Sequence, residues 1–313
     1  MRVFKAKFKQ CLQEKIKNIN ALYTNHLSNR FTYICRAEYL ANCALNSKTP
    51  GISNDKYCEN DIVVSLTTYG RRLYEVYLAI ESIMQQSMKP NKIVLWLGNE
   101  LENTEIPIVL KNQQKRGLEI NYCKDIKSYK KLIPALKAFP SAVIITIDDD
   151  FIYDFDLVEN LVNSYKKNPE LISSARMHRM KLTRKNKLEK YAKWVSNYEG
   201  FDVSPLNFPT GNGGILYPPH CFNNEVFNEE VFLDICKFAD DVWFKAMALL
   251  NGILSQKIFT HKKGGNDHIS NTIAQYMSLS HINIEKGMND VQLKAVFDKY
   301  NLYDRLSVSW NAK

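Results

Sequence analysis

The sequence predicts an α/β fold in which a mostly parallel sheet is flanked by helices and preceded by a helical N-terminal extension. Two observations support this prediction. From about residue 61 to residue 147, short β-branched segments alternate with segments whose apolar residues recur at helical spacing. Such alternation builds a parallel sheet with helices on both faces. The chain of 313 residues is 45% hydrophobic, which is enough for one sizeable core.

The elements follow each other in a regular order. Strands are expected at residues 61–67, 93–97, 118–123 and 142–147, with helices between them at residues 73–86, 106–116 and 129–139. Further helices are expected at residues 157–167 and 240–250, and further strands at residues 171–175 and 253–260. Since strand and helix alternate, the first four strands form a half-sheet of the nucleotide-binding kind.

Residues 1–60 are expected to form a basic, helical extension, and residues 61–313 the main domain. Within residues 1–28, apolar side chains recur at helical spacing among lysines. Such a helix can lie on an anionic membrane surface, or it can pack on the domain with its lysines in water. The sequence leaves both interpretations open.

Cysteine usage and the N-terminal residues predict a cytoplasmic protein, peripheral on the membrane if the basic helix binds there. The seven cysteines are scattered and form no C-x-x-C pair, which is typical of reduced thiols. No uninterrupted apolar stretch reaches the length of a signal peptide or a membrane span. We therefore expect neither secretion nor a transmembrane segment.

The net charge of +9, from 42 basic and 33 acidic residues, predicts an anionic partner. Nucleic acid is not expected, because the chain has no zinc-ligand spacing, RNA-binding aromatic signature or helix-turn-helix pattern. Neither common phosphate loop, G-x-G-x-x-G or G-x-x-x-x-G-K-[ST], follows an expected strand. Metal and basic side chains would have to neutralise a nucleotide's phosphates. The basic run at residues 176–193 is expected to be a solvated, mobile loop.

Three consecutive aspartates, Asp148, Asp149 and Asp150, end the fourth expected strand. The carboxyl ends of strands are where open α/β sheets bind ligands. Two like charges about 4 Å apart repel by about 1 kcal/mol in water and about 4 kcal/mol near a protein surface, so a cation is expected there. Carboxylate oxygens suit Mg²⁺ or Mn²⁺. The competing interpretation is an acidic turn in which Asp154 or Asp156 caps the next helix.

A second acidic pair, Asp240 and Asp241, opens an expected helix, where a carboxylate can act as the cap. Capping needs only one of the two, so a cap at Asp240 leaves Asp241 free for chemistry. Between the two acidic groups, the chain contains a turn-rich segment with Gly213 and Gly214. These glycines let a backbone approach a ligand closely, although a plain tight turn needs glycine as well.

Together these residues resemble the glycosyltransferases of the GT-A fold, family 2-like, and in particular bacterial enzymes that build surface polysaccharide or lipopolysaccharide. The resemblance covers residues 61 to about 300, and the order and spacing of its motifs make it specific. The motifs are Val-Ser-Leu-Thr-Thr-Tyr-Gly-Arg-Arg on the first strand, Ser-Tyr-Lys-Lys-Leu at residues 128–132, the triple aspartate, the Gly213-Gly214 loop and Ala-Asp-Asp at residues 239–241.

The resemblance implies transfer of a sugar from a nucleoside diphosphate sugar, expected to be a UDP-sugar, to a hydroxyl of a glycan or lipid-linked saccharide. Asp150 would ligate Mn²⁺ or Mg²⁺, and Asp148 or Asp149 would contact the ribose or the metal and its water shell. Asp241 would be the general base, with Asp240 beside it. Two acidic groups on opposite faces of the sugar fit an inverting displacement.

The resemblance also implies the remaining contacts of the donor. Thr67, Tyr69 and Arg72 would border the nucleoside, and Lys131 would help to neutralise the diphosphate. Many enzymes of this fold draw a further metal ligand from a histidine after the base-bearing helix, and His261 is the best-placed candidate. A lone histidine is more often structural.

Two other functions compete with this interpretation. A haloacid dehalogenase-type phosphatase would use Asp148 as nucleophile and Asp150 as acid and base, but such a motif opens its domain, whereas three strand–helix units precede it here. A non-catalytic module could hold an anionic glycan or membrane on its basic surface. Packing does not require carboxylates at a buried strand tip, so the aspartates favour an enzyme.

Overall fold

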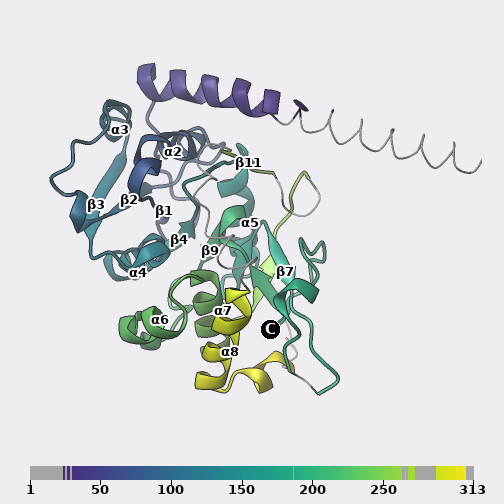
Figure 1. Ribbon diagram of the computed structural model, residues 1–313. Coiled ribbons are helices and arrows are strands. Elements are labelled where there is room, and N and C mark those ends of the chain that lie inside the picture. Colours follow the sequence, from purple (N-terminus) through teal and green to yellow (C-terminus); the bar gives the residue numbers. More distant parts are fainter. Residues whose placement is uncertain are drawn as a thin grey trace, which may run out of the picture.

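Figure 1 shows the computed structural model, which describes residues 24, 27, 28, 30–185, 187–262, 265, 267–271 and 287–307. A central sheet lies between two groups of helices. A further helix, drawn in purple, lies across the top of the molecule.

The central sheet has seven strands in the order β10-β6-β9-β4-β1-β2-β3. They are β1 (Ile62–Thr67), β2 (Lys92–Gly98), β3 (Leu118–Cys123), β4 (Val143–Thr146), β6 (Ile172–Ser174), β9 (Ile215–Tyr217) and β10 (Ser255–Lys257). Strand β9 is antiparallel to β4 and β6, and the other pairings are parallel. The predicted α/β class with a mostly parallel sheet is confirmed.

Helices cover both faces of this sheet. They are α2 (Tyr77–Met84), α3 (Ile108–Gln114), α4 (Ile133–Ala138), α5 (Leu157–Lys167), α6 (Glu229–Ile235), α7 (Asp240–Leu250) and α8 (Met288–Tyr300). Successive side chains of a strand point to opposite faces. Accordingly, Val63 packs in the apolar cluster with α4, α6, α7 and α8, and Val64 in the cluster with α2, α3 and α5. Burial on both faces explains the continuous apolar runs of β1, β2 and β4.

Short elements occupy the connections between strands and helices. They are the 3-10 helices η1 (Gly70–Tyr74), η3 (Lys127–Lys131), η4 (Tyr191–Lys193) and η5 (Gly211–Gly213), and the strand pairs β5 (Phe151–Ile152) with β11 (Ile269–Ser270) and β7 (Met177–Arg179) with β8 (Asn207–Pro209). The helix expected at residues 129–139 is thus divided into η3 and α4. Pro134 stands in the first turn of α4, where its missing N–H costs no helix bond.

Residues 30–46 form a helix where the sequence pattern is weak. Its inner face carries Leu40, which is fully buried against Leu78 of α2 and Ile152 of β5. The hydroxyl of Tyr33 donates a hydrogen bond to Asn271 Oδ1 at 2.8 Å. Because alanines make up much of this inner face, the apolar stripe is narrow and gives little periodic signal. This helix lies within the expected N-terminal extension, but beyond the residues 1–28 in which the sequence pattern is helical.

The basic helix predicted within residues 1–28 falls outside the described residues, apart from residues 24, 27 and 28. The division at residue 60 stays a prediction. Residues before it are bonded to the domain, because the N–H of Gly51 donates to Arg116 O at 2.8 Å and the Nε of Arg116 donates to Thr49 O at 2.7 Å. None of the helices in the described part of the chain is long and apolar enough to cross a membrane.

Lys245 is a buried cation in the middle of α7, with 3% of its surface exposed. Its Nζ has no hydrogen-bond partner among the described residues. Burial, reinforced by the nearby charge of Arg179, lowers the pKa of Lys245 to about 7. The folded protein therefore binds the lysine proton more weakly than the unfolded chain does.

We expect Lys245→Met to stabilise the protein. Between pH about 7 and 10 the unfolded chain carries a proton that the folded protein lacks, so wild-type stability rises with pH at up to about 1.4 kcal/mol per unit. Near pH 8 the methionine should raise the free energy of unfolding by on the order of 3 kcal/mol and remove this slope. Urea unfolding at several pH values measures both effects. The exposed Lys166→Met serves as the control, and an unchanged slope in Lys245→Met would contradict the expectation.

Candidate functional site

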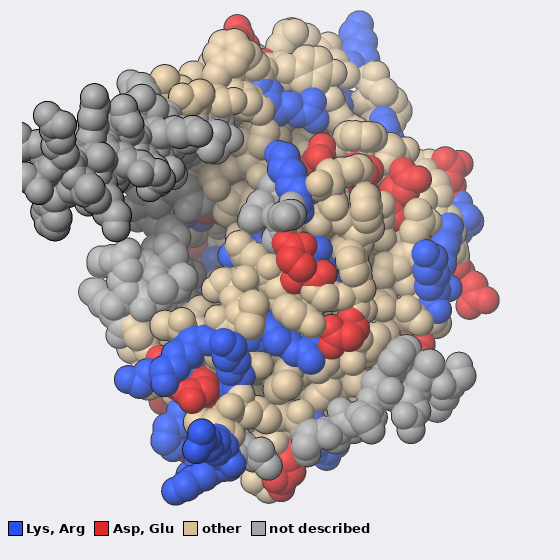
Figure 2. All heavy atoms as spheres, turned by 90° about the vertical axis from the view of Figure 1, so that its right-hand side faces the viewer, with Lys and Arg blue, Asp and Glu red and all other residues tan. Residues whose placement is uncertain are grey.

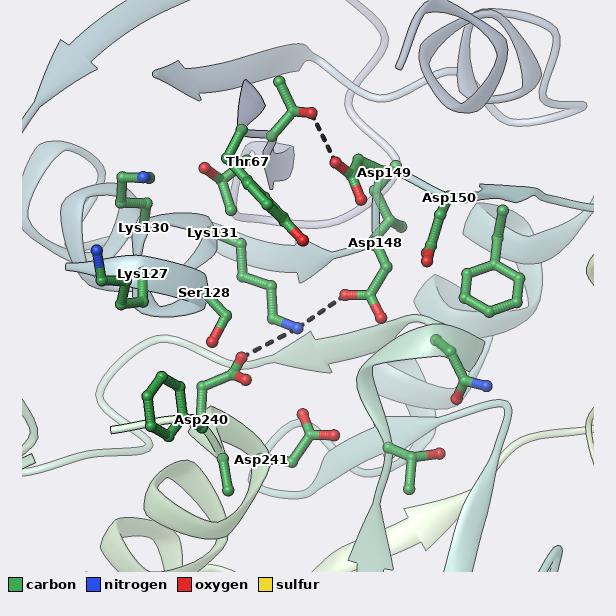
Figure 3. A pocket seen from close by; sticks show the side chains of 18 of the residues that line it. Thr67, Lys127, Ser128, Lys130, Lys131, Asp148, Asp149, Asp150, Asp240 and Asp241 are labelled. Carbon is green, nitrogen blue, oxygen red and sulfur yellow. Dashed lines mark hydrogen bonds and ion pairs between the residues drawn. The ribbon is translucent and has the colours of Figure 1, made fainter. Parts of the chain in front are cut away.

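A cavity of about 680 Å³ opens at the carboxyl ends of β1 and β4. The strand order reverses at this point, with β2 and β3 on one side and the later strands on the other, and such a reversal is where open α/β sheets bind ligands. Figure 3 shows the cavity, which is lined by residues of η1 and η3, the segment after β4, β7 and β8, and the start of α7.

Asp149 is held by hydrogen bonds on both carboxylate oxygens. Its Oδ2 accepts from Thr68 Oγ1 at 2.6 Å, and its Oδ1 accepts from Arg72 Nη1 at 2.7 Å. The side chain points away from those of Asp148 and Asp150 (Figure 3). With both oxygens used, Asp149 fixes Arg72 at the cavity wall.

Asp150 lies beside the same arginine, with its Oδ2 3.1 Å from Arg72 Nη2. It is 6% exposed. Burial, together with the charges of Asp148 and Asp149, raises the pKa of Asp150 to about 7, although Arg72 acts in the opposite direction. The carboxylate is thus crowded by negative charge in a place with little water.

Lys131 connects the two acidic groups that the sequence places far apart. Its Nζ lies 2.8 Å from Asp148 Oδ1 and 3.0 Å from Asp240 Oδ2 (Figure 3). Burial by itself would lower the pKa of this lysine, but Asp148, Asp240 and Asp241 outweigh burial and raise the pKa well above its ordinary value. The lysine therefore stays charged, and it holds Asp148 and Asp240 at the same wall of the cavity.

Asp240 and Asp241 are the first two residues of α7, whose N-cap is Ala239 and has no side-chain cap bond. Neither aspartate is used as the cap. Asp241 Oδ2 accepts a hydrogen bond from the Gly211 N–H at 3.0 Å, while its buried Oδ1 has no hydrogen-bond partner among the described residues. Burial, then the charges of Asp240 and Asp148, raise the pKa of Asp241 to about 7 against the effect of Lys131. Such a carboxylate can accept a proton near neutral pH.

The glycine segment contributes through Gly211, which the sequence analysis did not select. A Cβ at Gly211 would lie 2.6 Å from Lys131 Nζ and 3.3 Å from Asp241 Oδ1. Of the selected glycines, Gly213 lies against Arg176, where a Cβ would be 2.5 Å from Arg176 Cβ, and Gly214 has a φ of +85°. Glycine is therefore needed at residue 213 for close packing against Arg176, and it is favoured at residue 214 by the positive φ.

The acidic residues after β4 suit a hard divalent cation. Asp148 and Asp150 point into the cavity from the same side (Figure 3), and both offer only oxygen atoms, the ligands that Mg²⁺ and Mn²⁺ prefer. Burial first, and then the charges of Asp148 and Asp149, raise the pKa of Asp150, and a bound cation would favour its charged form.

His261 lies with a different acidic pair. Its Nε2 is 2.6 Å from Asp156 Oδ2, and one ligand atom from each of His261, Asp154 and Asp156 lies within 4.8 Å of the others. These three residues do not line the cavity of Asp150. Asp156 is the N-cap residue of α5 but makes no side-chain cap bond. The described contacts thus do not bring His261 to the triple aspartate.

The other predicted residues of the first strand end line the cavity. Thr67 Oγ1 donates a hydrogen bond to Trp96 O at 2.8 Å. The guanidinium carbon of Arg72 lies 5.4 Å from the centre of the Tyr69 ring, a distance at which cation and ring attract each other. The structure therefore places Thr67, Tyr69 and Arg72 at one wall, together with the triple aspartate.

Comparison with known proteins finds no family model and no curated protein that matches the chain. Among solved structures, it resembles the mannosyltransferase PcManGT from Pyrobaculum calidifontis in complex with GDP-Man and Mn²⁺ (14% identity, TM-score 0.42, covering 76% of this chain and 64% of that one). It also resembles S. aureus TarS 1–349 in complex with UDP (15%, 0.39, 65% and 59%). A third structure is CMP:2-keto-3-deoxy-manno-octonic acid synthetase complexed with CTP (9%, 0.39, 73% and 100%).

This chain spans about three fifths of the first two proteins. At these identities and TM-scores, nothing about function follows from the likenesses, and the function has to be inferred from the site itself.

A further part of the cavity wall was not expected from the sequence. The basic run at residues 176–193 was expected to be a solvated loop, but Arg176, His178 and Tyr191 line the cavity. Arg176 and His178 are fixed there because β7 pairs with β8 and buries Met177, and the N–H of Tyr191 donates to Asp290 Oδ1 at 2.6 Å. Only the outer basic residues of the run are exposed, namely Lys181, Arg184, Lys185, Lys187, Lys190 and Lys193. Figure 2 shows Lys and Arg side chains gathered low on the face that carries this segment.

Proposed function

We propose that the protein is a metal-dependent glycosyltransferase of the GT-A type, family 2-like, which moves a sugar from a nucleoside diphosphate sugar to a hydroxyl group. The observation that carries this proposal is the contact of Lys131 with both Asp148 and Asp240. Through this contact the triple aspartate, which would bind the cation, and the pair Asp240–Asp241, which would supply the proton acceptor, line one cavity. The size of this cavity suits a small-molecule ligand.

In this proposal Asp148 and Asp150 hold Mn²⁺ or Mg²⁺, which supplies positive charge for the diphosphate and for the charge that develops on it as the leaving group. Arg72 and Lys131 add fixed positive charge on the same side. Thr67 and Tyr69 border the nucleoside of the donor, for which a UDP-sugar is the first choice.

Asp241 accepts the proton of the attacking hydroxyl on its carboxylate. The hydroxyl then replaces the nucleoside diphosphate at the anomeric carbon, with one bond formed and one broken, and the configuration is inverted. Asp240 pairs with Lys131 and so holds the ammonium group of this lysine at the start of α7. The acceptor is a glycan or lipid-linked saccharide, as in the synthesis of bacterial surface polysaccharide or lipopolysaccharide. A place on the cytoplasmic membrane face, through residues 1–28, belongs to the same proposal.

A panel of nucleotide sugars with Mn²⁺ tests this function. We expect UDP-sugars to raise the melting temperature in a metal-dependent manner, because a ligand that binds only the folded protein stabilises it. We also expect slow release of UDP that stops when EDTA removes the metal. Release of inorganic phosphate instead would indicate the phosphatase. If no nucleotide sugar shifts the melting temperature and neither UDP nor inorganic phosphate is released, the result would favour the non-catalytic binding module.

A further inference from the structure

Arg176 differs from the other cations of the cavity because no carboxylate of the described part of the chain lies in contact with it. Arg72 is paired with Asp149 and Asp150, and Lys131 with Asp148 and Asp240. Lys127 and Lys130 are both paired with Asp125. Arg176 lines the same cavity but forms no ion pair with any described residue.

The position of Arg176 is built by the surrounding backbone and side chains. Its Nη1 donates to Thr210 Oγ1 at 2.9 Å and to Asn212 Oδ1 at 3.0 Å. A Cβ at Gly213 would lie 2.5 Å from Arg176 Cβ, so η5 packs directly on the arginine. Neutral oxygens thus hold one end of the guanidinium, while the buried Nε has no described partner. Burial lowers the pKa of Arg176, although the nearby Asp241 acts against this.

A half-buried guanidinium that forms no contact ion pair is costly, and an anionic ligand would reduce this cost. Its planar array of N–H donors matches the two oxygens of a carboxylate or phosphate. We propose that Arg176 binds a carboxylate or phosphate substituent carried by one of the two sugars that meet at Asp241. Assigning these ligands as donor sugar and acceptor rests on the proposed function. The anion site itself rests only on the cavity.

The acceptor is the expected carrier of this group. From the cavity wall at Arg176, the chain continues into the exposed basic segment of residues 181–193. A row of exposed lysines and arginines attracts a polyanion along its length. An anionic glycan bound with one of its charged sugars at Arg176 would also be attracted by this segment. An uncharged acceptor would use neither feature.

Two binding measurements separate the possible carriers. For the acceptor, ligand-observed NMR compares methyl glucuronide and glucose 6-phosphate with methyl glucoside, without and with UDP and Mn²⁺. For the donor, calorimetry compares UDP-glucuronate with UDP-glucose. In each case the measured quantity is the ratio of the charged to the uncharged ligand's affinity. In the wild-type protein we expect the acceptor ratio to be about tenfold or more, because hydrogen bonds to charged groups are the strong ones.

Arg176→Gln should bring this ratio close to one. The matched control is Arg71→Gln, an exposed arginine of η1 that does not line the cavity, and it should keep the wild-type ratio. If circular dichroism shows Arg176→Gln to be unfolded, Arg176→Lys replaces it. That variant should lose most of the preference, since a lysine has a single nitrogen, whereas the guanidinium binds Thr210 and Asn212 through Nη1 and keeps Nη2 for the anion.

A charge preference in the donor measurement that disappears with Arg176 would support the site and assign it to the donor sugar. The proposal fails if the wild-type protein shows no preference in either measurement, or if the arginine variants retain it. Failure of the glycosyltransferase proposal is recognised separately, because the acceptor measurement without UDP does not depend on nucleotide binding.

Discussion

Asp241→Asn is expected to retain affinity for a UDP-sugar while lowering kcat for sugar transfer by about 10²–10⁴-fold. The asparagine oxygen can still accept the hydrogen bond from the Gly211 N–H, so the start of α7 and the cavity wall should keep their structure. What the variant lacks is a group that accepts the proton of the attacking hydroxyl. The loss therefore falls on the chemical step and not on donor binding.

Transfer kinetics and calorimetry with the donor, measured on the same preparations, separate these two effects. The control is Asp234→Asn, an exposed carboxylate on α6, which should leave both unchanged. The wild-type pH profile gives an independent check. Because the base acts in its deprotonated form and the pKa of Asp241 is raised to about 7, kcat should fall as pH decreases through this value. A near wild-type kcat in Asp241→Asn would place the base elsewhere.

Asp150→Ala is expected to lower the Mn²⁺-dependent affinity for UDP by about a hundredfold or more, since a bound metal contributes several kcal/mol of charge stabilisation. The fold should survive, because Arg72 keeps its hydrogen bond to Asp149 at 2.7 Å. Removal of one of three neighbouring carboxylates also relieves their mutual repulsion. Isothermal titration with UDP, with and without Mn²⁺, measures the metal-dependent part of the affinity.

His261→Ala is the informative comparison for this experiment, since His261, Asp154 and Asp156 are a second group of possible ligands. If the triple aspartate holds the metal, His261→Ala keeps the wild-type response to Mn²⁺. The opposite pattern, with metal dependence lost in His261→Ala and retained in Asp150→Ala, would move the metal to the second group.

Strands β1, β2 and β4 could be predicted from the sequence because they are buried on both faces and read as uninterrupted apolar runs rich in β-branched residues. β1, β3 and α5 lie within one residue of the expected positions. The helix at residues 30–46 was not found, because its inner face consists largely of alanines around Leu40. Small side chains pack closely without a pronounced apolar stripe, so the helix depends on contacts with α2 and β5 that the local sequence does not reveal.

The clustered aspartates of the site could be predicted from the sequence. The residues whose place in the cavity depends on packing were missed. Aspartates at a strand tip and at a helix start are conspicuous because burial of like charges needs a reason. The three glycines of this turn could have drawn attention to Gly211, but only the fold shows that Gly211 is the one that faces Lys131. Arg176 was assigned to a solvated run because charged residues surround it. The methionines at residues 177 and 180, both buried, were the available signal that this part of the run faces inward.

The hydrogen bond between Gly211 and Asp241 limits the directions from which a substrate can be activated. A carboxylate that turns freely offers two equivalent oxygens, and water or any nearby hydroxyl can reach one of them. Here the hydrogen bond from the Gly211 N–H fixes the orientation of the carboxylate, so that its remaining lone pairs point in set directions. In the proposed reaction, the main chain would then help to decide which sugar hydroxyl reacts. The O–H bond of that hydroxyl has to point at one of these fixed lone pairs.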